Sequence, residues 1–281
     1  MPGVRLVATD LDGTLLGPGA ELSPRTAAAI RQAHAAGIIL VAATGRSHVD
    51  ARDRLGAAGT VRWLVCSNGA VLYDRDAGAV VERHDMDAST VPAAVDAIRA
   101  GFPDVCFAWE SARGFGCEAG FLVIAPSRTG GRGEVADRFG PPYPDGVSKL
   151  MVAHPDLRRD ALLAALRPVL VDGLVASASS VPFVDIAPPG VDKAFGVARL
   201  CERLGIHRDE VAGLGDHMND LALLRWAGRS VAMGDAHPAV LAAAREVTAT
   251  CEEDGAAIWL EALVRAGGGS GDGSSGAHAV G

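Results

Sequence analysis

The chain has 281 residues and 49% of them are hydrophobic, so it is long enough to bury at least one substantial core. Its 34 Asp and Glu residues outnumber its 26 Lys and Arg residues, and this acidic balance argues against nonspecific binding to nucleic acid or anionic membranes. No apolar run reaches the roughly 18 residues of a membrane span and no secretory pattern is visible, so we expect a cytoplasmic protein.

The first third of the chain alternates predicted strands with a predicted helix. Val4 to Thr9 and Ile38 to Ala43 are short apolar runs, typical of strands buried on both faces of a parallel sheet, and Trp63 to Cys66 is a third candidate. Ser23-Pro24 predicts a helix start between the first two strands, because Ser can cap free N–H groups and Pro is tolerated in the first turn. We expect this helix to end at Gly37.

The last third repeats the alternation in the order helix, strand, helix, strand, at Lys193 to Leu204, Val211 to Leu214, Leu221 to Ala227 and Ser230 to Met233. This pattern predicts an α/β fold with a doubly wound, Rossmann-like parallel sheet and helices on both of its faces. Ligands of such sheets bind beyond the carboxyl ends of the strands, where Asp10, Thr44 and Asp216 would gather.

The middle of the chain, residues 85–185, has Gly and Pro breaks between its predicted elements. We expect strands at Val105 to Trp109, Lys149 to Ala153 and Leu174 to Ala178, and a helix at Leu157 to Leu166. Mixed elements of this kind predict an inserted α+β domain, so that residues 1–84 and 186–266 form one discontinuous core. Residues 267–281 are rich in Gly and Ser and too poor in apolar side chains to offset the entropy of ordering, which predicts a disordered tail.

Two carboxylates follow the first predicted strand, in the run Asp10-Leu11-Asp12-Gly13-Thr14. A structural interpretation is a tight turn at Gly13 in which Asp12 bonds its own backbone. The functional interpretation is a pair in which one carboxylate attacks a substrate while its neighbour moves protons, with a metal ion neutralising both. This motif alone does not separate the two interpretations.

Two further elements carry groups that suit phosphate oxygens. Thr44-Gly45-Arg46 follows the second strand and offers a hydroxyl and backbone N–H groups, although Thr-Gly is also an ordinary turn and helix cap. Lys193 lies just inside a predicted helix behind Asp192. A lone Lys is ordinarily a solvated charge there, and Asp192 is an ordinary N-cap.

A fourth element is rich in oxygen ligands. Gly215-Asp216-His217-Met218-Asn219-Asp220 follows the Val211 to Leu214 strand, and its two carboxylates and carboxamide suit a hard cation such as Mg²⁺. An acidic capping loop is the structural alternative. Because all four elements lie at strand ends or helix starts of one predicted sheet, the functional interpretation gains over the structural one.

With these stretches the sequence resembles the haloacid dehalogenase superfamily, in particular its Cof-like subfamily IIB branch, whose C2-type cap domain is inserted between the second and third signature motifs. The resemblance covers nearly the whole core and rests on Asp10 to Leu16, Ala43 to Arg46, Ser67 to Ala70, Lys193, Gly215 to Asp220, Val231 to Gly234 and Glu253 to Ala256. It implies that residues 85–185 are the cap. The resemblance does not identify which residues of the cap recognise the substrate.

The resemblance implies a mechanism in which Asp10 attacks phosphorus and forms an aspartyl phosphate, while Asp12 acts first as general acid and then as general base. An Asp at that second position is typical of the phosphatase and phosphomutase relatives. Thr44 and Lys193 would stabilise charge on the transferring phosphoryl group, and Lys193 would also orient Asp10 and Asp216.

The resemblance also implies a metal site and a phosphate site. Asp10, the backbone carbonyl of Asp12 and Asp216 would bind Mg²⁺, with Asp220 supporting them directly or through water. The expected phosphate contacts come from Thr44, Gly45, Arg46, Lys193 and Asn219.

Several side chains have competing interpretations. Arg46 belongs either to the phosphate site or to a pair with a cap carboxylate, and Asn219 either to that site or to a helix cap. Asn68 is expected to hold a loop turn, and His217 to be an exposed loop residue. Lys149 is expected to be a solvated strand residue, with contact to an anionic substrate as the alternative.

The implied function is hydrolysis of a small phosphorylated metabolite, such as a sugar phosphate or a phosphorylated cofactor, by a monomer or homodimer. The alternatives are a phosphosugar mutase, similar to the phosphomannomutases, and a noncatalytic binding protein on the same fold. The joint presence of Asp10, Asp12, Lys193 and Asp216 argues against the noncatalytic alternative. The expected partner is a small-molecule phosphate ester, with no nucleic acid and no membrane.

Overall fold

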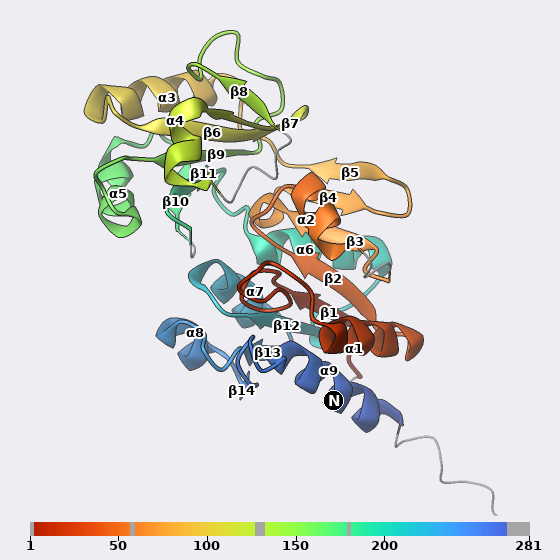
Figure 1. The fold of residues 1–281 in the computed structure, drawn as a ribbon. Coiled ribbons are helices and arrows are strands. Elements are labelled where there is room, and N and C mark those ends of the chain that lie inside the picture. Colours follow the sequence, from red (N-terminus) through yellow and green to blue (C-terminus); the bar gives the residue numbers. More distant parts are fainter. Residues whose placement is uncertain (1–2, 57–59, 127–132, 179–180, 269–281) are drawn as a thin grey trace, which may run out of the picture.

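The computed structural model describes residues 3–56, 60–126, 133–178 and 181–268. In these residues the chain forms two β-sheets, one of eight strands and one of six. The larger sheet is built from both ends of the chain and the smaller one from its middle, and Figure 1 shows them as two separate layers. The predicted division into a discontinuous α/β part and an α+β insertion therefore corresponds to two sheets.

The larger sheet is parallel apart from one edge hairpin. In spatial order its strands are β14 (Glu246–Val247), β13 (Arg229–Ala232), β12 (Val211–Gly215), β1 (Leu6–Thr9), β2 (Ile39–Ala43), β3 (Trp63–Cys66), β4 (Val71–Asp74) and β5 (Ala79–Arg83). Only the β3–β4 and β4–β5 pairs are antiparallel. The doubly wound parallel sheet expected from the sequence is confirmed, and the β4–β5 hairpin extends it at one edge.

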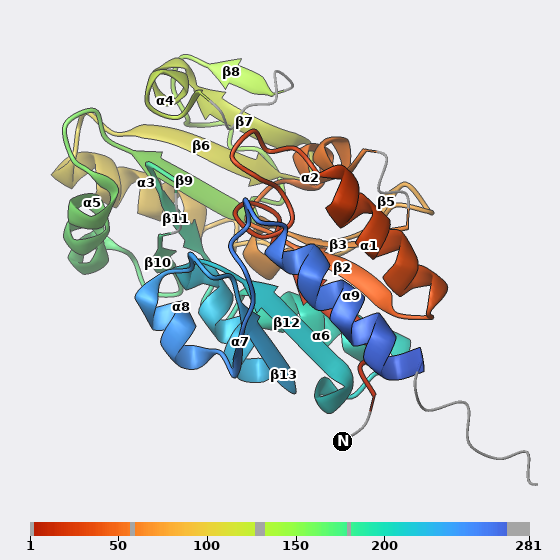
Figure 2. The same cartoon turned by 60° about the horizontal axis from the view of Figure 1, so that its bottom comes forward.

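Helices cover both faces of this sheet. The first face packs against α1 (Pro24–Ala35), α2 (His48–Leu55) and α9 (Gly255–Gly268), with Val240 of α8 (Pro238–Ala243) in the same cluster; the second packs against α6 (Lys193–Leu204) and α7 (Leu221–Trp226). Figure 2 shows α1 and α9 side by side across the sheet. In β1, Val7 faces the first cluster whereas Leu6 and Ala8 face the second, as expected of a strand buried on both faces.

Local signals set the helix ends near the sheet's carboxyl edge. Ser23 caps α1, because its Oγ accepts a hydrogen bond from Thr26 N at 3.0 Å. Asp192 caps α6 in the same way, accepting from Phe195 N at 2.9 Å. The Ser23 cap was predicted from the sequence, and the Asp192 cap was the structural alternative considered there; it places Lys193 in the first turn of α6.

The second sheet has helices on both of its faces. Its strands, in spatial order, are β10 (Val175–Ser177), β11 (Val184–Ala187), β9 (Lys149–Ala153), β6 (Cys106–Ser111), β7 (Gly114–Glu118) and β8 (Glu134–Ala136). Helices α3 (Thr90–Gly101) and α5 (Arg159–Leu166) pack on one face, and α4 (Ala119–Ile124) packs on the other. The chain enters this sheet after β5 and returns from β11 to α6.

The predicted domain edge at residue 185 falls inside β11, which continues to Ala187. The strand continues because Val184 and Ile186 alternate into the same apolar cluster on either side of Asp185. At the other end, Gly267 and Gly268 complete α9, although the sequence placed them in the tail. The rest of the predicted tail, residues 269–281, lies outside the described residues.

Within the described ranges, none of the helices combines the length and the apolar character needed to cross a membrane.

One close approach ties the loop after β3 to the start of α6. Gly69 has φ +103°, and a Cβ placed on it would lie 1.9 Å from the carbonyl oxygen of Asp192. We predict that Gly69→Ala lowers the free energy of unfolding by about 3 kcal/mol, because it adds this clash to the strain of a positive φ. Urea denaturation measures the change.

Gly78 provides the matched control. It also has a positive φ, +64°, but a Cβ there would meet no atom within 4 Å. Gly78→Ala should therefore lower the free energy of unfolding by only about 1 kcal/mol, because it adds only the strain of a left-handed backbone. Equal losses in the two variants would show that the contact with Asp192 does not constrain Gly69.

Candidate active site

The carboxyl edge of the larger sheet gathers the polar residues that the sequence singled out. Asp10 follows β1, Thr44 follows β2 and Asp216 follows β12, and these three strands are parallel neighbours in the order β12-β1-β2. The strand pairing alone therefore brings together positions that are up to about two hundred residues apart in the chain.

Lys193 lies at the centre of this edge and is fully buried. Its Nζ is 2.9 Å from Asp10 Oδ1 and donates a hydrogen bond to Asp220 Oδ1 at 2.6 Å. The other oxygen of Asp220 accepts hydrogen bonds from the backbone N–H groups of Asp216 and His217, both at 3.0 Å. Lys193 thus joins the loop after β1 to the loop after β12.

Three carboxylates meet beside Lys193. Each of Asp10, Asp216 and Asp220 has an oxygen within 4.8 Å of an oxygen of the other two. Burial, opposed by Lys193, raises the pKa of Asp10 well above its usual value. Burial and the charge of Asp220 raise the pKa of Asp216 to about 7. One ammonium does not balance three carboxylates, two of them buried and the third partly buried, and oxygen donors at this spacing fit a hard divalent cation such as Mg²⁺.

The loop after β1 leaves room for this cluster. Gly13 has φ +78°, and a Cβ on it would lie 2.6 Å from Asp216 Oδ2. The neighbouring Thr14 donates its hydroxyl to Asp216 Oδ1 at 3.1 Å. Only Gly allows the loop to close over the Asp216 carboxylate in this way.

Asp12 is held by Arg46 rather than by the carboxylate cluster. Arg46 Nε donates to Asp12 Oδ2 at 2.7 Å and its second terminal nitrogen donates to Oδ1 at 2.6 Å, a bidentate pair. The remaining terminal nitrogen of Arg46 pairs with Asp50 of α2. Of the two alternatives for Arg46, the pair with a carboxylate of the inserted region is wrong, because the adjacent strands β1 and β2 bring Asp12 next to Arg46.

Thr44 is buried, and its backbone joins two neighbouring loops. Its N–H donates to Val65 O at 2.8 Å, and its carbonyl accepts from Asn68 N at 3.0 Å. Its hydroxyl oxygen accepts from Arg46 N at 3.2 Å.

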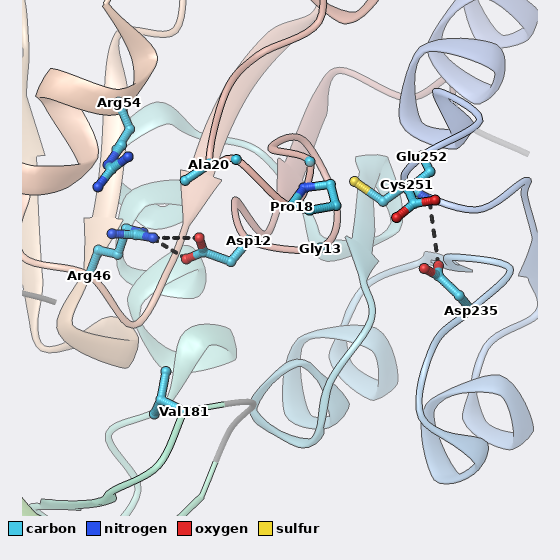
Figure 3. A pocket seen from close by; sticks show the side chains of 12 residues that line it. Asp12, Gly13, Pro18, Ala20, Arg46, Arg54, Val181, Asp235, Cys251 and Glu252 are labelled. Carbon is cyan, nitrogen blue, oxygen red and sulfur yellow. Dashed lines mark hydrogen bonds and ion pairs between the residues drawn. The ribbon is translucent and has the colours of Figure 1, made fainter. Parts of the chain in front are cut away.

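A cleft of about 530 Å³ opens beside Asp12. Figure 3 shows Arg46 and Arg54 on one side of it and Asp235 and Glu252 on the other. Val181, in the segment just before β11, also lines the cleft. The cleft is therefore lined mainly by loops of the larger sheet, with Asp12 at its wall and Val181 as the contribution of the inserted region.

Lys149 is the clearest departure from the sequence analysis, which expected a solvated side chain. It is 2% exposed, and its Nζ donates to the carbonyl of Gly45 at 2.6 Å. Its ammonium also lies 3.5 Å from Glu110 Oε1 and 3.4 Å from Asp185 Oδ1. Lys149 is buried because the first residue of β9 faces the loop after β2. The local sequence pattern does not predict this contact.

Two asparagines and a histidine also have other surroundings than expected. Asn68 is held by more than its own turn: its Nδ2 donates to Asp185 Oδ2 at 3.0 Å and its Oδ1 accepts from Asn219 Nδ2 at 3.2 Å. Asn219 therefore bonds another side chain instead of a helix end. His217, expected to be exposed, is half-buried, and burial lowers its pKa. An acidic residue inside an apolar strand, Asp185, is the one signal that pointed to these contacts.

The comparison with protein families and the comparison with curated proteins point to the same class of protein. The model of the haloacid dehalogenase-like hydrolases matches residues 7–260. An HMP-PP phosphatase of Enterobacter sp. (strain 638) is 29% identical over 240 residues, which cover 85% of this chain and 87% of that protein. An HMP-PP phosphatase of Citrobacter koseri is 29% identical over 250 residues with the same coverage.

Solved structures share the fold at lower identity. SMU.1108c from Streptococcus mutans UA159 superposes with a TM-score of 0.83 at 21% identity, covering 94% of this chain and all (100%) of that one. The sugar phosphatase BT4131, of HAD subclass IIB, superposes with a TM-score of 0.75 at 21% identity, covering 92% of this chain and 99% of that one. Both sheets of the present chain are therefore part of the shared architecture.

The carboxylate cluster leads to a prediction about Mg²⁺ and stability. Without a divalent cation at pH 8, Asp216→Asn should melt at a higher temperature than the unchanged protein, because it removes one crowded negative charge. Saturating Mg²⁺ should raise the melting temperature of the unchanged protein by about 5 °C and that of the variant much less, reversing the order. Differential scanning fluorimetry with and without a chelator measures both effects.

Asp76→Asn serves as the control, because the Asp76 side chain is 63% exposed and pairs only at the surface with Arg62. Its response to Mg²⁺ should equal that of the unchanged protein. The same Mg²⁺ response in Asp216→Asn would rule out Asp216 as a ligand.

Proposed function

The chain belongs to the haloacid dehalogenase-like hydrolases and is an enzyme of the phosphatase type, and we propose that it hydrolyses a small phosphorylated metabolite through a phospho-aspartyl intermediate on Asp10. The observation that carries this proposal is the carboxylate of Asp10, held by Lys193 in a cluster of acidic oxygens next to Asp12. A nucleophile, a proton carrier and a cation site then lie on one sheet edge.

The two oxygens of Asp10 have different environments, which suits nucleophilic attack. Oδ1 accepts a hydrogen bond from Leu11 N at 2.7 Å and faces Lys193. Oδ2 is then the oxygen that attacks phosphorus, so that an O–P bond forms as the bond to the leaving oxygen breaks. Lys193 opposes the rise that burial causes in the pKa of Asp10, because the ammonium favours the charged form.

Asp12 is proposed to carry the proton in both halves of the reaction. Its carboxyl group protonates the leaving oxygen as Asp10 becomes phosphorylated, and its carboxylate then takes a proton from the water that attacks the aspartyl phosphate. That second step releases inorganic phosphate and restores Asp10. The bidentate pair with Arg46 fixes the position of the Asp12 carboxyl group.

The remaining residues of the site are proposed to stabilise charge on the phosphoryl group. Thr44 contributes its hydroxyl and Lys193 its ammonium, and the Gly45 N–H and the Asn219 side chain complete the oxygen contacts. Mg²⁺ would be held by Asp10, Asp216 and the Asp12 carbonyl with Asp220 in support, and when bound it neutralises the charge of the carboxylates and the phosphate.

The substrate class follows from the relatives. The most similar curated proteins reported above are HMP-PP phosphatases, and BT4131 is a sugar phosphatase. We therefore propose a small phosphorylated metabolite such as HMP-PP or a sugar phosphate. The cleft beside Asp12 provides the space for its leaving group.

The nucleophile assignment yields a direct prediction. Asp10→Asn should lower Mg²⁺-dependent phosphate release from p-nitrophenyl phosphate by about a thousandfold or more, because an amide oxygen does not form the covalent intermediate. Circular dichroism and the melting temperature should show that the fold is retained. Steady-state kinetics with malachite green detection measures the loss.

Asp104→Asn, at an exposed position after α3, is the matched control and should keep full activity. Asp10→Asn protein with the activity of the unchanged enzyme would refute Asp10 as nucleophile. A wild-type protein that moves phosphate between sugar hydroxyls in place of releasing it would favour the mutase alternative.

A further inference from the structure

The loop after β2, Thr44-Gly45-Arg46, is held in part by a side chain of the second sheet. All three carbonyl groups of this loop accept hydrogen bonds. The first and the third accept from backbone N–H groups of the loop after β3, at 3.0 and 2.9 Å. The Gly45 carbonyl, between them, accepts from Lys149 Nζ of β9 at 2.6 Å. One ammonium of the inserted region therefore completes the support of a loop that belongs to the larger sheet.

The contact with Lys149 sets the direction of the peptide group between Gly45 and Arg46. This peptide is trans, so its C=O and N–H groups point in opposite directions. The C=O is directed to Lys149, and the N–H on the other side donates to Thr44 Oγ1 at 3.2 Å. A hydroxyl oxygen that accepts a hydrogen bond still has its own hydrogen to donate. A single peptide group thus links Lys149 to the hydroxyl of Thr44.

The position of the Lys149 ammonium favours a role toward this loop over a role as a charge partner. Its Nζ lies 2.6 Å from Gly45 O, but 3.5 Å from Glu110 Oε1 and 3.4 Å from Asp185 Oδ1. An ammonium that served only to neutralise the two carboxylates would make its shortest contact with one of them. The shortest contact goes to the loop instead.

The two carboxylates keep Lys149 in place and hold the neighbouring loop. In the second sheet β9 lies between β6 and β11, so Glu110 of β6 and Asp185 of β11 flank Lys149. The other oxygens of these carboxylates accept hydrogen bonds from Ser67 Oγ and Asn68 Nδ2 in the loop after β3. That loop supplies the N–H groups for the two outer carbonyls of the loop after β2. The junction therefore fixes the loop after β2 both directly and through its neighbour.

Lys149 reaches the substrate cleft only through this loop. Its side chain is 2% exposed, and the described residues that line the cleft beside Asp12 include Arg46 but not Lys149. We propose that Lys149 is a positioning residue for phosphoryl transfer, because its hydrogen bond to Gly45 O holds the loop in the form in which the Thr44 hydroxyl donates to the phosphoryl group. This inference rests on the proposed phosphatase function and adds a residue of the inserted region to that same site.

The effect of such a residue does not depend on the leaving group. The loop after β2 acts on the phosphoryl group, which all substrates share, so a displaced loop weakens the binding of every ester and of inorganic phosphate alike. A lysine that contacted an anionic leaving group would instead discriminate between esters by their charge.

The test compares Glu110→Gln with Lys149→Met/Glu110→Gln, two proteins that differ only at residue 149. Met is unbranched like Lys but has no N–H donor. The double variant keeps the net charge of the junction, because one positive and one negative group are lost together. Melting temperatures and circular dichroism show that both proteins fold. The triple variant that also carries Asp185→Asn leaves no charge in the junction and should show the same losses as the double variant.

With Mg²⁺ present, kcat/KM of the double variant should be about a hundredfold below that of Glu110→Gln, since a displacement of about 1 Å costs a factor of this size. The factor should be the same for p-nitrophenyl phosphate and for 4-carboxyphenyl phosphate, whose leaving groups differ in charge. Calorimetric titration of inorganic phosphate should give a dissociation constant about tenfold higher in the double variant.

Glu110→Gln alone should match the unchanged protein in these measurements, because it retains the hydrogen bond from Lys149 to Gly45. A merely structural role of Lys149 would lower the fraction of folded enzyme, and with it the apparent kcat. It would leave KM and the dissociation constant of phosphate unchanged.

The outcomes separate this inference from the proposed function. Equal KM and phosphate dissociation constants in the single and double variants would overturn the positioning role. A loss confined to 4-carboxyphenyl phosphate would overturn it as well, since it would assign Lys149 to the leaving group. A wild-type protein that binds phosphate more tightly than the double variant but releases none from any ester would retain the positioning role and refute the phosphatase function.

Discussion

The structure depends on the burial of Lys193 between Asp10 and Asp220. This ammonium is fully covered and contacts both carboxylates, so the loops after β1 and β12 cannot separate without exposing an unpaired charge. The Asp192 cap holds α6 at the position where Lys193 enters the cluster. The ion pair with Lys193 also favours the charged form of Asp10, against the burial that raises its pKa.

Close backbone approaches make this arrangement possible. Gly13 lets the loop after β1 fold over Asp216, and Gly69 lets the loop after β3 touch the Asp192 carbonyl at the start of α6. A side chain at Gly13 would overlap the Asp216 carboxylate, and a side chain at Gly69 would overlap the Asp192 carbonyl oxygen. The catalytic edge is therefore assembled from tight turns around charged groups, with the apolar clusters of the sheet beneath it.

The second sheet adds polar contacts of a different kind. Its buried charges do not reach the carboxylate cluster directly but act on the loops next to it, through Gly45, Ser67 and Asn68. The larger sheet thus carries the carboxylate cluster, and the second sheet supports the loops beside it.

Much of the fold was predictable because its signals are local. The buried runs of β1, β2, β3, β12 and β13 were recognised by their uniform apolar character, within one or two residues, and the caps at Ser23 and Asp192 by residue type. The β4–β5 hairpin, α9 and the end of β11 were missed or misplaced, because their boundaries depend on packing against distant elements.

The sequence by itself determined which residues meet at the sheet edge, since parallel strands that neighbour one another end together and carry Asp10, Thr44 and Asp216 to one place. Only the tertiary structure decided who pairs with whom there. Arg46 pairs with Asp12, Lys149 is buried against Gly45, and Asn219 hydrogen-bonds Asn68. Each of these contacts joins segments that are remote in the chain. These pairings depend on distances between folded segments, and the order of residues along the chain does not specify those distances.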